Sequence, residues 1–243
     1  EALRAEMRAE IEVDAGGRVV CPGFVDPHTH LVWMGDRAGE FEQRVAGATY
    51  MEIMAQGGGI MSTVRATRTA SFDALVAATR TRLDRMLAHG TTTVEVKTGY
   101  GLDTKTELRQ FDVAVTLGQR HPATVVPTFL GAHAIPAEYK NRPEAYVELV
   151  IDEMLPAVAR RVQELELDRM PFCDVFCEDG AFDLDQSRRI LEAAHDLGFP
   201  LKIHVDEFAS LGGARLAVEL EATSADHMVT TPPTDITALG IAD

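Results

Sequence analysis

Short runs of β-branched and other apolar residues alternate along the chain with longer stretches of helical periodicity. The apolar runs predict six strands, and the stretches between them predict helices. The expected strands span residues 19–25, 91–97, 123–130, 173–177, 201–205 and 222–226. The expected helices span residues 71–89, 102–120, 143–162, 185–197 and 212–220. This alternation is typical of βα units joined into a parallel sheet.

The helix expected over residues 71–89 has clear boundary signals. Ser71 is a suitable N-cap residue, and Gly90 stands where a glycine ends a helix. The first predicted strand is not followed by the glycine patterns of dinucleotide or P-loop folds, so those classes lose weight.

Ionisable and hydrogen-bonding side chains stand at or just after the ends of the predicted strands. Reactive groups gather at the carboxyl ends of the strands in parallel barrels. We therefore predict an α/β fold. Of the two folds that this pattern allows, an incomplete (β/α)8 TIM barrel of about six βα units is favoured and a doubly wound sheet is not. The side chains concerned are His28, His30, Lys97, Tyr100, His133, Glu178, His204, Glu207 and His227.

Composition and charge restrict the function further. The chain has 243 residues, of which 46% are hydrophobic and 25% charged, as in ordinary globular domains. A net charge of −15 disfavours binding to nucleic acid or to an anionic membrane. Three cysteines are too few for a disulfide scaffold and indicate a reducing, cytoplasmic compartment. The apolar runs are shorter than the roughly 20 residues that a membrane span needs.

The segment Asp26-Pro27-His28-Thr29-His30 offers two imidazoles on one side of an extended chain. His204, after another predicted strand, adds a third. Three neutral imidazoles are a common ligand set for zinc or iron and leave room for a water molecule. Two incidental loop histidines and a core histidine are the alternative reading, but the combination favours a single metal ion.

Other strand-end residues are candidates for substrate chemistry. Glu207 could accept a proton or hold a substrate N–H group. His227 could stabilise a developing oxyanion or act as a fourth metal ligand. Arg37 could bind a carboxylate, and Tyr100 and His133 lie in glycine-containing loops that could approach a ligand. Lys97 could in principle be carboxylated and bridge two metal ions, but no second set of ligands is evident.

The motifs PGFVDPHTH, AQGGGIMSTVRATR, GTTTVEVKTGYGL, TFLGAHAIP, LKIHVDEF and SADHMV resemble those of the amidohydrolase superfamily. More narrowly, they are similar to those of the imidazolonepropionase family, and they cover most of the chain after Val19. That family hydrolyses 4-imidazolone-5-propanoate to N-formimidoyl-L-glutamate in histidine degradation.

The resemblance implies roles for particular residues. It implies that His28, His30 and His204 bind one zinc or iron ion. Arg37, Tyr100, His133 and Glu207 match substrate-binding residues, with Glu207 and His227 in catalytic roles. It further implies a homodimer and a small-molecule substrate.

The resemblance also implies what lies outside these residues. The aspartate ligand of the family would lie beyond Asp243, together with the last barrel strands. We expect residues 1–20 to be the remnant of a small β-sandwich and residues 21–243 to be a partial barrel. We therefore expect a fragment that is inactive when isolated.

Two other functions remain open at this point. A deaminase of a heterocyclic base would share the metal site, although the GGGI, KTGYGL and GAHAIP segments argue against it. A non-enzymatic assembly protein with an amidohydrolase-like fold would have lost its metal ligands, whereas His28, His30 and His204 are all present.

Overall fold

A computed structural model describes residues 10–49, 52–53 and 58–242. Within this part of the chain, six parallel strands form one sheet in the order β1 to β6, so that each pairs with its neighbours in sequence. The strands are β1 (Phe24–Asp26), β2 (Thr91–Lys97), β3 (Thr124–Ala132), β4 (Phe172–Cys177), β5 (Lys202–Val205) and β6 (Ser224–His227). Consecutive parallel pairing is the topology of a (β/α) barrel.

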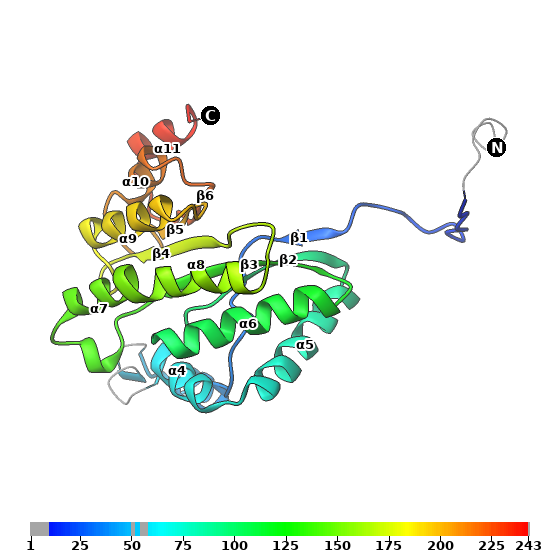
Figure 1. Ribbon diagram of the computed structural model, residues 1–243, viewed down its shortest axis with the longest axis horizontal. Coiled ribbons are helices and arrows are strands. Elements are labelled where there is room, and N and C mark those ends of the chain that lie inside the picture. The colour runs from blue at the N-terminus through cyan, green and yellow to red at the C-terminus, as the bar shows by residue number, and fades with distance from the viewer. Residues whose placement is uncertain (1–9, 50–51, 54–57, 243) are drawn as a thin grey trace.

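Helices connect the strands and cover the outer side of the sheet (Figure 1). Helices α5, α6, α9 and α10 pack against β2, β3, β4 and β5, respectively. The helices are α2 (Ala38–Val45), α4 (Ile60–Thr69), α5 (Phe72–Ala88), α6 (Thr104–Arg120), α7 (Pro143–Leu149), α8 (Leu155–Glu164), α9 (Leu184–Asp196), α10 (Gly213–Glu219) and α11 (Pro233–Leu239), with a short 3₁₀ turn at Ala137–Tyr139.

The sheet is strongly curled. In a flat sheet with strands about 4.8 Å apart, β1 and β6 would be separated by about 24 Å. Instead, the Nδ1 atom of His28, just after β1, lies 2.9 Å from the Oδ2 atom of Asp226 in β6. The Nζ atom of Lys202 in β5 likewise approaches Glu95 in β2 at 2.9 Å. The six strands therefore form a half-barrel, and the predicted fold class is confirmed.

The two faces of the sheet differ in chemistry because side chains alternate along each strand. Val94 and Val96 point outward into an apolar core beneath α5 and α6. Glu95 and Lys97, which alternate with these valines along β2, point inward and are 4% and 0% exposed. The polar residues of the strands thus gather inside the half-barrel.

The N-terminal strand is much shorter than expected. The prediction of a strand over residues 19–25 is wrong at its start: only Phe24–Asp26 pairs, with β2 alone. Val19 and Val20 are 91% and 82% exposed, so their β-branched side chains have no surface to pack on. Residues 1–20 were predicted to be the remnant of a β-sandwich. Residues 1–9 of this segment lie outside the described residues.

The helix expected over residues 143–162 is interrupted by a π-helical turn at Val150–Met154, between α7 and α8. Pro156 has no N–H group to donate to the carbonyl of Asp152, which loosens the regular helical ladder there. By contrast, Ser71 caps α5 as predicted, accepting a hydrogen bond from the Ala74 N–H group at 3.2 Å.

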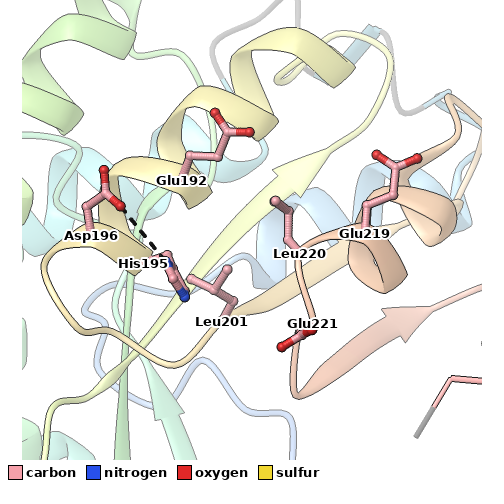
Figure 2. A pocket seen from close by; sticks show the side chains of 7 residues that line it. All are labelled: Glu192, His195, Asp196, Leu201, Glu219, Leu220 and Glu221. Atoms are coloured by element: carbon pink, nitrogen blue, oxygen red, sulfur yellow. Dashed lines mark ion pairs between the residues drawn. The ribbon is translucent and has the colours of Figure 1, made fainter.

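Two hollows in the described part of the chain lie away from the strand ends that carry the histidines. One, of about 310 Å³, lies between α9 and the end of α10, near Leu201 at the start of β5 (Figure 2). The other, of about 760 Å³, is lined by α6, the start of β3 and residues 167–172. Among the described helices, none is long and apolar enough to cross a membrane.

Candidate metal centre and active site

Four imidazole rings converge at the carboxyl ends of β1, β5 and β6. His28 and His30 follow β1, His204 lies in β5, and His227 ends β6. The ring centre of His28 lies 4.5 Å from that of His204 and 5.0 Å from that of His227. His30 lies 5.4 Å from both His28 and His204. The curl of the sheet thus brings together the three histidines that were expected to bind metal.

Two carboxylates, the buried Asp174 and the partly buried Asp226, orient these rings. Asp174 Oδ1 lies 2.9 Å from Nδ1 of His204, and Asp226 Oδ2 lies 2.9 Å from Nδ1 of His28. A carboxylate at Nδ1 favours the tautomer that is protonated there. In that tautomer of the neutral ring the Nε2 atom carries no proton and can bind a metal ion.

Several of these side chains lie close enough together to share a metal ion. The Nε2 atoms of His30 and His204 face each other at 3.4 Å. Two imidazole nitrogens that share a tetrahedral zinc ion at about 2.0–2.1 Å lie about 3.4 Å apart. The ligand nitrogens of His28, His204 and His227 all lie within 4.8 Å of one another. His30 is not in that group and approaches His204, so the structure brings His227 rather than His30 together with the other two. Burial and the neighbouring His133 and His204 hold the pKa of His30 well below its ordinary value, which keeps the ring neutral.

A buried lysine connects the two orienting carboxylates. Lys97 Nζ lies 2.6 Å from Asp174, 3.0 Å from Glu95 and 3.3 Å from Asp226. Burial alone would lower the pKa of Lys97, but Asp174 and Glu95 raise it above its ordinary value. A carboxylated Lys97 would place a further negative charge among these carboxylates. The geometry therefore supports an ammonium group at Lys97.

The same network lowers the pKa of Asp226. Burial would raise the pKa of its carboxyl group, but the hydrogen bond with His28 and the Lys97 ammonium lower it to about 2. Asp174 is held below its ordinary pKa for similar reasons, by His204 and Lys97 against burial. Both groups are thus carboxylates at neutral pH.

His133 and Tyr100 border the histidine cluster. The rings of His133 and His30 are stacked with centres 4.7 Å apart, and Tyr100 lies 5.4 Å from His133. Nδ1 of His133 lies 2.9 Å from the carbonyl oxygen of Gly99 and donates to it in its neutral form. The second nitrogen of His133 is then an acceptor.

Arg37 and Glu207 complete the group of predicted site residues. Arg37 precedes α2, donates from Nε to Thr63 at 3.0 Å and hydrogen-bonds Tyr100. Glu207 lies beyond β5, with its Oε2 atom 3.5 Å from Nε2 of His227. The structure therefore places every predicted site residue in one neighbourhood.

Sequence reasoning did not select Asp174, Asp226, Glu95 or Lys202 as site residues. A usable signal existed for Asp174, because it is a charged residue in the apolar strand Phe172–Cys177. Asp226 directly precedes His227, and the sequence analysis selected only the histidine of this pair. Their partners stand at distant positions in the sequence, and only the curl of the sheet brings them together.

Comparison with solved structures found a protein with a similar fold. A crystal structure of 5-methylcytosine deaminase from Klebsiella pneumoniae liganded with 5-fluorocytosine matches with a TM-score of 0.56 and 19% sequence identity. The match covers 88% of this chain and 48% of that chain. At this identity the likeness concerns the fold alone.

Sequence comparison is more specific. The chain is 62% identical over 232 residues to an imidazolonepropionase of Herpetosiphon aurantiacus. It is 58% identical over 217 residues to that of Symbiobacterium thermophilum and 55% identical over 241 residues to that of Chloroflexus aggregans. These matches cover 95%, 89% and 98% of this chain but 54%, 50% and 56% of the relatives. No family model matches. The resemblance to imidazolonepropionases is confirmed, and the chain spans about half their length.

The environment of His133 predicts a pH-dependent stability. Burial, and secondarily the neighbouring His204, lower its pKa from 6.5 to about 3. Because the unfolded state binds more protons between these values, stability is complete above about pH 6.5 and falls as the pH falls toward 3. We expect His133→Asn, whose amide can still donate to Gly99, to lose less stability between pH 7 and pH 5 than the unsubstituted protein.

Urea denaturation of the full-length protein at both pH values measures this difference. His195→Asn is the matched control, because His195 is exposed on α9 and its side chain is 73% accessible. Equal pH dependence in His133→Asn and the unsubstituted protein would contradict a neutral, buried His133.

Proposed function

We propose that the full-length protein containing this chain hydrolyses 4-imidazolone-5-propanoate to N-formimidoyl-L-glutamate. The observation that carries the proposal is the convergence of His28, His30 and His204 with the four proposed substrate-binding residues. This convergence occurs in a chain that is 62% identical to an imidazolonepropionase. The oxygen of water bonds to the ring carbonyl carbon, the adjacent C–N bond breaks, and the nitrogen leaves as an N–H group.

In this proposal His28, His30 and His204 hold one zinc or iron ion. Such an ion would supply Lewis-acid activation of water and polarisation of the ring carbonyl group. Asp174 and Asp226 keep Nδ1 of His204 and His28 protonated and fix the direction of each ring. The protein thereby avoids reorganising its ligands during the reaction.

The residues around the cluster suit the groups of the substrate. The carboxylate of Glu207 can accept a hydrogen bond from a ring N–H group of the substrate. Neutral His133 offers a further acceptor nitrogen. His227, next to Glu207, can donate to the oxygen on which negative charge develops. The guanidinium of Arg37 and the hydroxyl of Tyr100 can donate to the propanoate carboxylate.

Product analysis of the full-length protein tests the proposal. We expect imidazolone propanoate to be consumed with formation of N-formimidoyl-L-glutamate, detected by mass spectrometry, and without release of ammonia. Protein stripped of metal by a chelator serves as the control. Release of ammonia from cytosine or a related base, with no opening of the imidazolone ring, would assign the protein to the deaminases instead.

Substitution of Arg37 tests its contact with the substrate carboxylate. Arg37→Met keeps much of the length of the side chain but removes its charge. A charge-assisted hydrogen bond of about 2 kcal/mol corresponds to a rise in KM of roughly 30-fold. Steady-state kinetics should show this rise with little change in kcat, and unchanged kinetics would place Arg37 outside substrate binding. Arg44→Met, on α2 but facing solvent, is the control.

The proposal extends to the setting of the enzyme. We propose a homodimer in the cytoplasm. Free Cys21, Cys173 and Cys177 support a reducing compartment. Sedimentation of the full-length protein would test the dimer.

A further inference from the structure

A buried carboxylate holds the loop that carries Tyr100. Glu107, in the first turn of α6, has no exposed surface. Its Oε2 atom accepts the N–H group of Gly99 at 3.0 Å, and its Oε1 atom accepts those of Gly101 and Leu102 at 2.8 Å each. The side chain of Thr98 also hydrogen-bonds it. Both carboxylate oxygens are therefore committed to donors from one five-residue loop.

This loop, residues 98–102, has a conformation that needs such support. Gly99 has φ of +103°, and Leu102, which is not a glycine, has φ of +54°. A Cβ atom on Gly99 would lie 2.8 Å from Nδ1 of His133, so the loop backbone and His133 are in close contact. Since Gly99 also provides the carbonyl partner of His133, the loop determines the position of His133 as well as that of Tyr100.

A second buried carboxylate holds the loop that carries Glu207. Glu178 follows β4 and is 3% exposed. Its Oε2 atom accepts the N–H group of Phe208 at 2.9 Å, and its Oε1 atom accepts that of Ala209 at 3.0 Å. The two residues that immediately follow Glu207 are thus tied to the neighbouring strand end.

We propose that Glu107 and Glu178 are positioning residues, each of which fixes one substrate-binding loop. Glu107 fixes the loop with Tyr100 and its neighbour His133, and Glu178 fixes the loop with Glu207. The proposal rests on the function proposed above, because these loops matter for catalysis only if they contact the substrate. Neither carboxylate acts on the substrate itself.

The geometry explains why a carboxylate is needed at each position. A glutamine of the same size has only one acceptor oxygen. At position 107 its NH₂ group would meet the N–H group of Gly99 or those of Gly101 and Leu102, because each oxygen of Glu107 accepts from a different part of the loop. The backbone must then shift, and a shift of this loop moves Tyr100 and His133.

Crossed double-mutant cycles in the full-length protein test the proposal. We expect Glu107→Gln and Glu178→Gln each to raise KM about ten- to hundredfold, with a smaller change in kcat and with metal content unchanged. The effect of Glu107→Gln should shrink in a Tyr100→Phe background and persist in a Glu207→Gln background. The effect of Glu178→Gln should show the reverse pattern, because only neighbouring residues couple.

The control is Asp112→Asn, the equivalent change on α6 at a carboxylate that pairs with Arg161 at 2.8 Å. It should lower stability without changing KM. If Glu107→Gln does not fold, Thr98→Val removes one of the four donors and should give the same crossed pattern more weakly. Equal coupling of each glutamate to both partners, or loss of activity with KM unchanged, would overturn the proposal.

Amide hydrogen exchange without substrate separates this proposal from the proposed function. Glu107→Gln should speed exchange at Gly99, Gly101 and Leu102, and Glu178→Gln should speed it at Phe208 and Ala209. If the unsubstituted protein does not open the imidazolone ring, the proposed function fails. The exchange pattern still tests whether the two glutamates hold their loops in that case. Unchanged exchange in both variants would show that they do not.

Discussion

Replacement of His28 by alanine in the full-length protein should abolish metal binding and activity together while leaving the protein folded. His28 is one of the three proposed metal ligands, and its ring lies 4.5 Å from that of His204. The fold should persist because Asp226 keeps Lys97 as a partner at 3.3 Å after the imidazole is removed. Elemental analysis after dialysis should give one zinc or iron ion per chain for the unsubstituted protein and close to none for the variant.

The control for this experiment is His195→Ala, at an exposed histidine of α9. It should keep both metal and activity. Two tightly held ions per unsubstituted chain would contradict a site for one ion, and would point again to a modified Lys97. Full metal content in the His28→Ala variant would remove His28 from the ligand set and favour His227, which the geometry also permits.

Replacement of Lys97 by methionine should destabilise the protein severely. The ammonium of Lys97 has no exposed surface and contacts Asp174, Glu95 and Asp226. Without it, Glu95 keeps Lys202 at 2.9 Å, while Asp174 and Asp226 keep their histidine partners but lose the ammonium. Removing one partner of a buried ion pair typically costs about 3–5 kcal/mol. Urea denaturation of the metal-free protein should show a loss of this order.

The matched control is Lys140→Met, at an exposed lysine, which should change stability little. A double variant, Lys97→Met with Asp174→Asn, should recover part of the lost stability because it removes one of the uncompensated charges. If Lys97→Met were as stable as the unsubstituted protein, the three carboxylates would not depend on this ammonium. The network that orients His28 and His204 would then need another explanation.

Much of the fold follows from local sequence. The predicted strand over residues 91–97 is confirmed at both ends, and α5 begins after its predicted cap, Ser71. The strand expected from residue 19 fails because, among the described residues, only Phe24–Asp26 has a strand to pair with. Helices α2, α4 and α11 were not predicted. Helix α2 has no buried residue and α11 buries only Asp235, whereas the buried residues of α4 are two threonines and one valine. Where burial is slight, the hydrophobic pattern carries little information.

The candidate site divides in the same way between sequence and tertiary structure. The sequence by itself determined that His28, His30, His204 and His227 stand at strand ends, because a strand end follows from local periodicity and turn residues. Only the tertiary structure decided which side chains meet inside the half-barrel. The pairs Asp174–His204 and Asp226–His28 are 30 and 198 residues apart in sequence. They form because a curled sheet turns its inward-facing side chains toward one axis, and no local pattern specifies that curvature.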